Sequence, residues 1–378
     1  MLVKKVFARK ILDSRGEPTI EVSLFDCKAS APSGKSKGKH ETPDFLKSPD
    51  YSVKLVNSLE FNIEINSFSD LLKIESYIEK KIKIKDSRKI GANVLFALES
   101  VILKALAKSL SKSLWQIIDS KASKFPVPLG NVIEGGLHAH NKNHPQFQEF
   151  LIIPQYKDIS KNVKLMQSIH EELGKILKTN RKTDEGAWQT NLSNRAVFTL
   201  LSKFKNIKIG TDIAASSFYK DNFYNFGDYK LTRQGQIDNI NDLIKKFHLF
   251  YVEDPLEEED FKGFSKINKE KCLITGDDLT ATHMDRLKRA INNKSLNAMI
   301  IKPNQNGSLL ELKSIFEACK KHRIKTILSH RSGETLDNAL ADYAFGFQAD
   351  FIKSGISTKW REAKLNRLIE IEKGIKNL

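Results

Sequence analysis

The stretch Leu249-Phe250-Tyr251-Val252-Glu253-Asp254-Pro255 decides the fold, because it joins a short apolar run to two carboxylates and a proline. The same order of residue types recurs towards the C-terminus: Leu273–Thr275 precedes Gly276-Asp277-Asp278, Ala298–Ile301 precedes Lys302, Thr326–Leu328 precedes Ser329-His330-Arg331, and Phe351-Ile352 precedes Lys353. Short apolar strands that alternate with amphipathic helices are typical of parallel βα units. More than about five such units, each ending in a polar residue, predict an α/β fold of the (β/α)8 barrel type with its site at the strand ends.

The N-terminal part of the chain has a different pattern. Val3–Ala8 and Thr19–Phe25 alternate apolar and polar residues, and they flank the turn-forming segment Asp13–Pro18. Alternation on both sides of a turn predicts an antiparallel pair of strands.

Helical spacing of apolar residues follows in Asp70–Lys85 and Gly91–Ile118. The segment Lys121–Pro128 contains two prolines and is the predicted domain boundary. We therefore expect a small α+β domain at residues 1–120 that caps a catalytic barrel at residues 121–378.

Composition excludes several classes of protein. The chain has 378 residues, and its apolar segments are too short and too charged to supply the roughly 20 apolar residues of a membrane span. The N-terminus lacks the pattern of a signal peptide, so we expect a soluble cytoplasmic protein. Three widely spaced cysteines indicate neither a disulfide framework nor a zinc site. The net charge of +16 comes from scattered lysines, so we do not expect nucleic acid to be the main partner.

Three carboxylates lie at the ends of separate predicted strands. Asp212 follows Ile207–Thr211, and Glu253 and Asp277 end the two strands already quoted. Ligands that are all oxygen suit Mg²⁺ better than zinc or copper. The sequence therefore predicts a magnesium site at the barrel mouth.

Two lysines, Lys302 and Lys353, end later strands and face the same mouth. A metal beside a lysine of lowered pKa can make a carbon acid reactive, because the metal stabilises the enediolate while the lysine takes the proton. Each residue alone has a structural interpretation: Glu253-Asp254 and Asp277-Asp278 could cap helices, and His330 could be an ordinary loop histidine. Their recurrence at strand ends favours a shared site.

Several short segments of the sequence resemble motifs of the enolase family, and they occur in the same order as in that family. They are Ala8–Val22 (ARKILDSRGEPTIEV), Pro32–Gly38 (PSGKSKG), Gly135–Ala139 (GGLHA), Gln148–Phe150 (QEF), Asp184–Gly186 (DEG), Glu253–Pro255 (EDP), Gly276–Thr280 (GDDLT), Lys302–Gly307 (KPNQNG) and Ser329–Thr335 (SHRSGET). The resemblance covers nearly the whole chain, and the last of these segments, Ser329–Thr335, is especially specific to the family.

The resemblance implies an activity and its cofactors. Enolases are phosphopyruvate hydratases, carbon–oxygen lyases that interconvert 2-phospho-D-glycerate and phosphoenolpyruvate in glycolysis and gluconeogenesis. Their superfamily is an established case of a lysine or histidine base acting with one or two Mg²⁺ ions. Here the resemblance implies two Mg²⁺ per site, the tighter one held by Asp212, Glu253 and Asp277 and the second by Ser36 on a mobile loop.

The resemblance also implies roles for the other site residues. Lys302 would be the general base and Glu185 the general acid, with Glu149 beside it. Contacts to a small phosphorylated carboxylate substrate would come from His138, Glu149, His330, Arg331, Ser332 and Lys353. Among these, Arg331 and Ser332 would hold the phosphate, and Lys353 would bind the substrate carboxylate.

The sequence departs from the family pattern in five ways. A small insertion lies within His140–Pro145, and the chain is short between Gly38 and Lys121 and again after Lys353. The family's Arg-Ser-Glu-Arg motif is replaced here by Thr358-Lys359-Trp360-Arg361. Lys35 and Lys37 make the loop around Ser36 unusually basic.

Two alternatives stay open. One is another proton-abstracting enzyme of the same superfamily that acts on a different carboxylic acid, although such an enzyme needs no phosphate grip like Arg331-Ser332. The other is a non-catalytic protein that has kept the fold, which the presence of every catalytic position disfavours.

The resemblance implies a homodimer or a higher homo-oligomer. In the enolases, an arginine and a glutamate matching Arg9 and Glu21 pair with the partner's last helix. In this chain the matching helix positions are Lys373 and Glu370, so both pairs become repulsive. We therefore expect a weakened interface, or one shifted so that Arg367 replaces the lost arginine.

Overall fold

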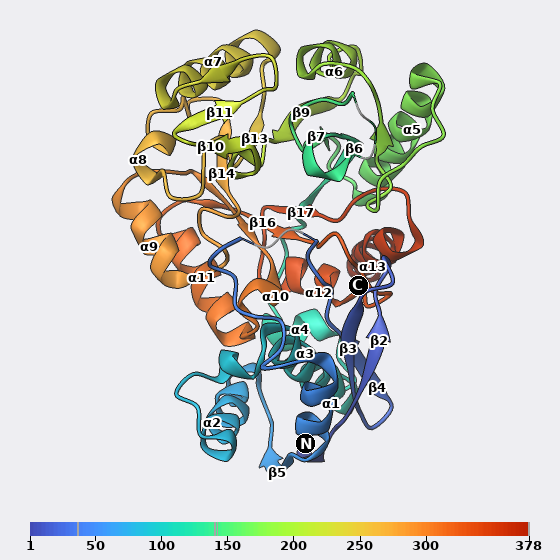
Figure 1. Cartoon of the computed structure of the whole chain (residues 1–378). Helices are drawn as coiled ribbons and strands as arrows, with labels where there is room; N and C mark the ends of the chain where they lie inside the picture. Colours follow the sequence, from blue (N-terminus) through green and yellow to red (C-terminus); the bar gives the residue numbers. More distant parts are fainter. Residues whose placement is uncertain (36–37, 140, 142, 377–378) are drawn as a thin grey trace.

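The computed structural model describes residues 1–35, 38–139, 141 and 143–376, and shows a small N-terminal unit packed against a barrel (Figure 1). The N-terminal strands are β1 (Leu2–Lys5), β2 (Phe7–Leu12), β3 (Pro18–Leu24), β4 (Cys27–Ser30) and β5 (Glu60–Glu64). The helices are α1 (Pro49–Asn57), α2 (Leu71–Ile82), α3 (Ala92–Ser109) and α4 (Leu114–Ile118), with 3₁₀ turns at Phe68–Asp70 and Ser87–Ile90. β2, β3 and β4 form an antiparallel sheet, and β1 pairs with β5. An α+β unit thus precedes the barrel, as predicted.

The predicted strand Val3–Ala8 is wrong in its bounds. β1 ends at Lys5 and β2 begins at Phe7, with the buried Val6 between them. β1 pairs with β5, whereas β2 pairs with β3. The residue pattern alone does not show that the chain changes its partner strand at Val6.

The predicted helix Gly91–Ile118 is two helices. α3 ends at Ser109, and Ser111 has a φ of 53°, a left-handed conformation that a right-handed helix cannot continue. Ser113 then starts α4, and its backbone N–H donates to Gln116 Oε1 (2.9 Å), as in a capping box. The break thus has a local cause.

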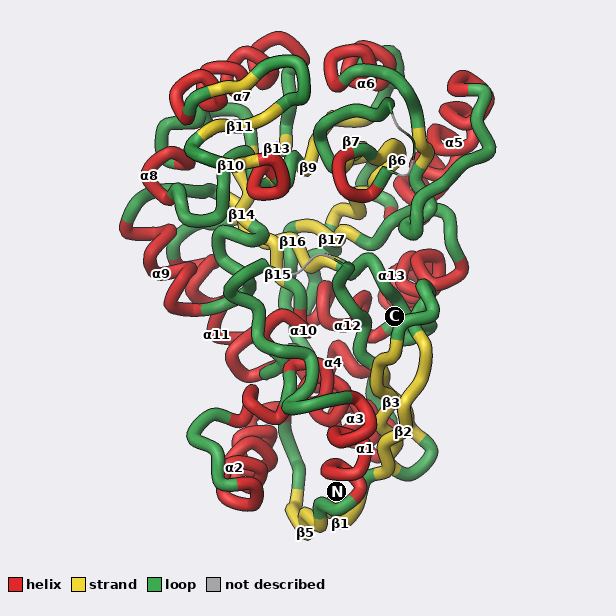
Figure 2. The backbone as a smooth tube through the Cα atoms, viewed as in Figure 1, coloured by secondary structure: helices red, strands yellow, loops and turns green. Residues whose placement is uncertain are grey.

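Eight strands close the barrel, because the last of them pairs with the first. They are β6 (Val127–Glu134), β7 (Glu149–Pro154), β9 (Ile207–Asp212), β13 (Tyr251–Glu253), β14 (Leu273–Gly276), β15 (Ala298–Ile301), β16 (Lys325–Ser329) and β17 (Phe351–Lys353). The helices around them are α5 (Ile159–Leu177), α6 (Asn194–Leu201), α7 (Arg233–Phe247), α8 (Phe261–Phe264), α9 (Met284–Asn292), α10 (Pro303–Asn306), α11 (Leu309–Lys321), α12 (Ala339–Gly346) and α13 (Lys359–Lys376). Shorter elements are β8 (Trp188–Gln189), β10 (Tyr219–Lys220), β11 (Phe223–Asn225), β12 (Lys230–Leu231) and 3₁₀ turns at Gly136–His138 and Ala215–Phe218. Figure 2 shows the helices outside the strands.

One strand breaks the expected run of parallel βα units. β7 is antiparallel to both of its neighbours, β6 and β9. Parallel strands need a long crossover, usually a helix, whereas β6 and β7 are joined by a loop whose described part holds only a 3₁₀ turn. The barrel prediction is confirmed, but the expectation of parallel units is wrong at this strand.

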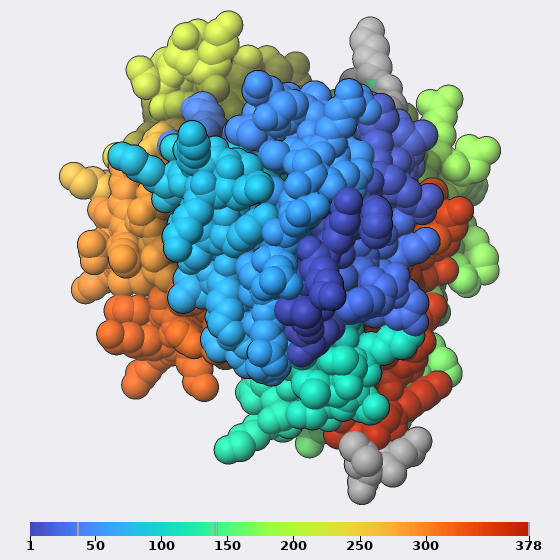
Figure 3. Space-filling view, turned by 90° about the horizontal axis from the view of Figure 1, so that it is seen from below, coloured from blue at the N-terminus to red at the C-terminus, as the bar shows by residue number. Residues whose placement is uncertain are grey.

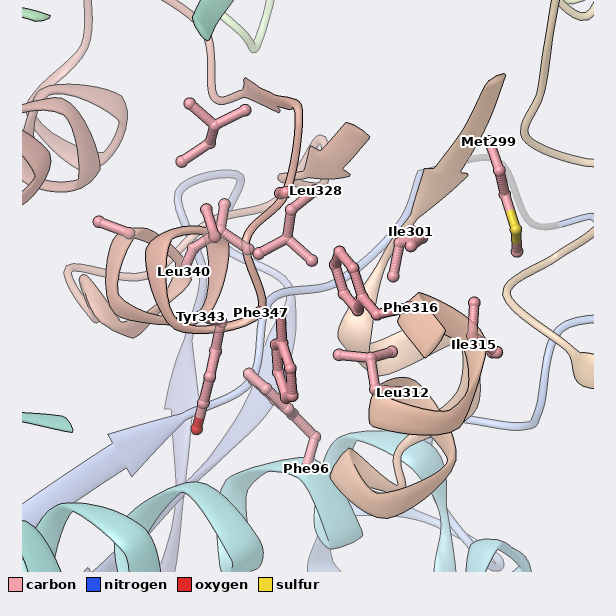
Figure 4. Packing of buried hydrophobic residues seen from close by; sticks show 14 of the residues in the cluster. Phe96, Met299, Ile301, Leu312, Ile315, Phe316, Leu328, Leu340, Tyr343 and Phe347 are labelled. Carbon is pink, nitrogen blue, oxygen red and sulfur yellow. The ribbon is translucent and has the colours of Figure 1, made fainter. Parts of the chain in front are cut away.

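The barrel and the N-terminal unit share one core. Inside the barrel lies a small cluster formed by Leu129, Leu151, Ile153, Tyr251, Ala298, Ile300 and Ile327. α3 is buried on nearly all sides, and its Phe96 contacts Tyr343 of α12 with ring centroids 6.0 Å apart (Figure 4). Seen from below, N-terminal residues fill the centre of that face and later parts of the barrel surround them (Figure 3). This packing fixes the N-terminal loops over the barrel.

In the part of the chain that the structure describes, no helix combines the length and apolar character needed to cross a bilayer.

Candidate active site

The carboxyl ends of the barrel strands bring the predicted residues together. Asp212 ends β9 and Glu253 ends β13, and the two are direct partners in the strand register. Lys353 ends β17 opposite Ser329 at the end of β16. Because neighbouring parallel strands end at one edge, their terminal side chains converge there.

A cavity at this edge collects most of the predicted site residues. It is lined by His138, Glu149, Glu185, Asp212, Asp277, Lys302, His330, Arg331, Ser332 and Lys353. Glu253 is fully buried behind them, in contact with Lys353. Ser36, the remaining predicted ligand, and its neighbour Lys37 lie outside the described residues.

Lys353 is surrounded by carboxylates. Its Nζ lies 2.8 Å from Glu149 Oε2, 2.9 Å from Glu253 Oε2 and 3.6 Å from Asp212 Oδ2. Burial alone would lower the pKa of the Lys353 ammonium, but the charges of these carboxylates raise this pKa well above its ordinary value. Lys353 is therefore a firmly charged cation.

Lys302 pairs with Asp277. Its Nζ donates to Asp277 Oδ2, while Gln305 Nε2 donates to Asp277 Oδ1 (3.2 Å). Burial opposes the charged form of Lys302, but the attraction of Asp277 outweighs it and raises the pKa of Lys302 above its ordinary value. In this arrangement the ion pair with Asp277 stabilises the ammonium form of Lys302.

The opposite side of the cavity is rich in glutamates. One ligand-type atom from each of Glu134, His138, Glu149 and Glu185 lies within 4.8 Å of the others. Burial disfavours the imidazolium, but Glu134, whose Oε2 lies 3.5 Å from His138 Nδ1, and the charges of Glu185 and Glu149 raise the pKa of His138 to about 9. His138 is thus charged at neutral pH.

Glu185 is held by two neutral groups. Asn131 Nδ2 donates to Glu185 Oε2 (3.0 Å), and His330 Nε2 lies 3.3 Å from the same oxygen. Burial, followed by the nearby cations Arg361 and Lys353, lowers the pKa of His330 well below its ordinary value. His330 therefore meets Glu185 as a neutral ring.

Arg331 presents its guanidinium to the cavity beside a carboxylate from the N-terminal unit. Its Nη2 lies 2.9 Å from Glu41 Oε2 and 3.1 Å from Glu41 Oε1, and its Nη1 donates to Asn304 Oδ1 (3.2 Å). Gly34 packs against this guanidinium, and a Cβ at that position would overlap Nη2. Glycine is therefore required where this loop passes Arg331.

The N-terminal loop and the Ser329–Thr335 segment are joined by backbone hydrogen bonds. Ser33 and Gly333 each donate to the other's carbonyl at 2.8 Å. Lys35 N donates to Ser332 Oγ (2.6 Å), and Lys35 Nζ lies 3.5 Å from Asp184. The N-terminal unit thus forms part of the cavity wall.

The last helix supports the same segment from behind. Arg361 of α13 is almost wholly buried and donates to the carbonyls of Arg331 (2.7 Å) and Ser332 (2.8 Å). Lys364 pairs with Glu334 (2.7 Å). The segment that departs from the family pattern, Thr358–Arg361, therefore ends in a residue that positions Arg331.

The acidic residues fit a hard divalent cation by their chemistry. Oxygens of Asp254, Asp277 and Asp278 lie within 4.8 Å of one another. In the described residues Asp212 and Glu253 are not part of such a group. Lys353 Nζ contacts the carboxylates of both residues. The donor set is all oxygen, which suits Mg²⁺, but its geometric grouping differs from the one expected.

Several cavity residues were not singled out from the sequence: Gly34, Glu41, Leu137, Gln148, Ala214, Ser217, Asp254, Asp278 and Ser329, together with Glu134 and Asn131 behind them. Asp254 directly follows Glu253 and Asp278 directly follows Asp277, both of which were predicted as metal ligands, so the positions of Asp254 and Asp278 in the sequence were a usable signal. Glu134 ends β6, so its place at a strand end was also a usable signal. Glu41 offers no such signal, because it is placed by contacts between distant segments.

These features define a class of protein: a barrel of eight strands with an antiparallel second strand, a capping α+β unit and a mouth lined by carboxylates and lysines. Family models described as "Enolase, N-terminal domain" and "Enolase, C-terminal TIM barrel domain" match residues 3–118 and 122–377. The chain belongs to the enolase family.

Relatives named enolase are similar to this chain over nearly its whole length. The enolase of Ehrlichia ruminantium (strain Gardel) is 35% identical over 98% of this chain and 96% of its own length. The enolase of Methanocorpusculum labreanum is 35% identical over 98% of both chains, and that of Archaeoglobus fulgidus is 33% identical over 98% of this chain and 97% of its own.

Proposed function

We propose that this protein catalyses the reversible dehydration of 2-phospho-D-glycerate to phosphoenolpyruvate. The observation that carries the proposal is the convergence of Arg331 and Ser332 with Lys302, Lys353 and Glu185 on one cavity. A guanidinium and a hydroxyl can hold a phosphate, and an ammonium can hold a carboxylate. A base and an acid on opposite sides suit removal of a proton and a hydroxyl from adjacent carbons.

In the proposed reaction, Lys302 Nζ takes the proton from C2 of the substrate, and the electron pair of that C–H bond forms the C2–C3 double bond. The C3 hydroxyl leaves as water with a proton from Glu185. Lys353 holds the substrate carboxylate, with Glu149 and His138 beside the reacting carbons and His330 lining the pocket. Two Mg²⁺ ions, held by Asp212, Glu253, Asp277 and Ser36, would supply positive charge that offsets the added negative charge.

The proton transfer requires Lys302 in its neutral form. In the structure its ammonium is paired with Asp277, so a cation that binds Asp277 would compete with Lys302 for this carboxylate. A cation held there would supply positive charge that favours the neutral form of Lys302. The nearby Asp254 and Asp278 provide further oxygens for the cation.

The test is direct. Purified protein with Mg²⁺ should produce the ultraviolet absorbance of phosphoenolpyruvate from 2-phosphoglycerate, and the reverse reaction should consume it. A panel of other hydroxy acids without a phosphate should give no turnover, because they leave Arg331 and Ser332 without a ligand. Turnover of such an acid alone would instead favour another activity of the superfamily, and no turnover of any acid would favour a binding protein.

We also propose domains at residues 1–120 and 121–378 and a cytoplasmic location, which follows from the proposed role in glycolysis and gluconeogenesis. We propose a homodimer with a weakened interface. Arg9 and Glu21 already pair within the chain (2.8 Å). Repulsion between like charges across an interface disfavours association.

The last helix offers little compensation. Arg367 forms a bidentate pair with Asp342 (2.8 and 2.9 Å), and Glu370 lies 3.3 Å from Arg367. A shift that brings Arg367 to the partner would break these bonds, so we favour the weakened interface over the shifted one. Sedimentation velocity should show dissociation on dilution at low salt and a firmer dimer at high salt, where repulsion is screened. A dimer that persists on dilution at low salt would contradict the proposal.

A further inference from the structure

Glu134 is a buried carboxylate that the proposed reaction leaves without a role. It ends β6 and is fully buried. Its Oε2 lies 3.5 Å from His138 Nδ1, and its Oε1 accepts a hydrogen bond from Asn131 Nδ2. The same Asn131 nitrogen donates to Glu185 Oε2 (3.0 Å). One carboxylate is therefore linked to His138 directly and to Glu185 through a single amide.

The backbone enforces this arrangement. Between Glu134 and His138 the chain turns sharply, and Gly136 has a φ of 49°. A Cβ on Gly135 would overlap the carbonyl oxygen of Pro145. Only glycine allows so close an approach, so the turn returns His138 to the carboxylate four residues before it.

The groups that face this pair are mostly acidic. Glu149 lies opposite Glu134 in the strand register, and Glu185 approaches from the loop before β8. Lys35 and Asp184 line a small cavity together with Glu134, His138, Glu185 and Ser332. Because Lys35 Nζ lies 3.5 Å from Asp184, His138 is the cation that directly contacts Glu134 among the described residues.

We propose that Glu134 is a positioning residue that keeps His138 as an imidazolium at the cavity and, through Asn131, holds the carboxyl group of Glu185 in place. The raised pKa of His138 agrees with this geometry, since the nearby Glu134 carboxylate is the largest influence that favours its charged form. An imidazolium is a donor at both nitrogens, so one N–H can remain on Glu134 while the ring offers positive charge to an anionic substrate. The catalytic part of this inference rests on the proposed function.

The first test follows the titration of His138 by NMR in protein labelled at histidine Cε1, with the signal assigned through His138→Gln. In the unmodified protein the signal should keep its imidazolium position up to about pH 8, since a pKa raised to about 9 leaves the ring protonated below that value. In Glu134→Gln the pKa should fall by about 1 to 3 units, as expected when a contacting opposite charge is removed. Glu171→Gln, which changes an exposed glutamate on α5, should leave the titration unchanged.

The second test uses the pH profile of kcat/KM, which reports the ionisations of the free enzyme. Its alkaline limb should move to lower pH in Glu134→Gln by the same amount as the NMR titration. Glu134→Asp keeps the charge and should restore part of the shift. A merely structural role would lower activity evenly at all pH values.

The outcomes separate the two proposals. The inference is wrong if His138 in the unmodified protein titrates at or below its ordinary value, a result that needs no variant to fold. It is also wrong if Glu134→Gln titrates like the unmodified protein or leaves the kinetic limb in place. If the pKa of His138 falls in Glu134→Gln but the unmodified protein does not turn over 2-phosphoglycerate, the link between Glu134 and His138 is supported. Only the proposed function is then overturned.

Discussion

The two sides of the cavity differ in how their charges are balanced. The lysine side consists of Asp212, Glu253, Asp277, Lys302 and Lys353, and the glutamate side of Glu134, His138, Glu149 and Glu185. On the lysine side, each ammonium is in direct contact with a carboxylate. On the glutamate side, three carboxylates lie close to a single imidazole, and one of them, Glu149, also contacts Lys353 of the lysine side (2.8 Å). A divalent ion on the lysine side must compete with ammonium groups, whereas the glutamate side is suited to sharing protons.

The largest effect should come from removing divalent cations, which tests the lysine side. Excess EDTA should abolish activity and added Mg²⁺ should restore it, because the proposed ligands are carboxylate oxygens that bind hard cations. Mg²⁺ should also raise the Tm of the dialysed protein, since a ligand that binds only the folded state stabilises it. Full activity in excess EDTA would contradict the metal requirement.

A pair of variants compares the sides directly. Lys302→Ala and Glu185→Gln should each lower kcat by at least about 10²-fold, because each removes a proton-transfer group. Circular dichroism should show the fold intact in both. Lys321→Ala and Glu317→Gln on the exposed face of α11 are matched controls, and they should keep full activity. If Lys302→Ala retained near-normal turnover, the base would have to be another residue.

The smallest effect concerns the basic loop next to the glutamate side. Replacing both Lys35 and Lys37 with serine should lower kcat/KM at low salt by a few-fold, because the local positive potential attracts an anionic substrate. The difference should vanish at high salt, where such attraction is screened. If the salt dependence of kcat/KM is unchanged in the double variant, these lysines do not steer the substrate.

Local patterns predicted the lysine side well because its residues are placed by the ends of successive strands. Glu253 and Lys353 each end a strand, and Lys302 follows one directly. Once the chain is seen as a barrel, their meeting point follows from topology alone.

Local patterns could not predict the contacts that join distant segments. Glu41 meets Arg331 across 290 residues, and Arg361 reaches back 30 residues to the Arg331 carbonyl. The antiparallel course of β7 depends on a loop length rather than on a residue type. The ion pair with Asp277 raises the pKa of Lys302. The positions of the two residues at strand ends do not show that their side chains form this pair.

The hydrogen bonds from Arg361 to the Arg331 and Ser332 carbonyls have a consequence for biosynthesis. A ribosome makes the N-terminal loop first and α13 last, and both contact the segment that carries Arg331. The growing chain can form its N-terminal unit and most of the strands early, since domains fold as units during synthesis. The proposed phosphate grip, however, gains its last support only when Arg361 has left the exit tunnel, so this grip is completed after the barrel strands have been made.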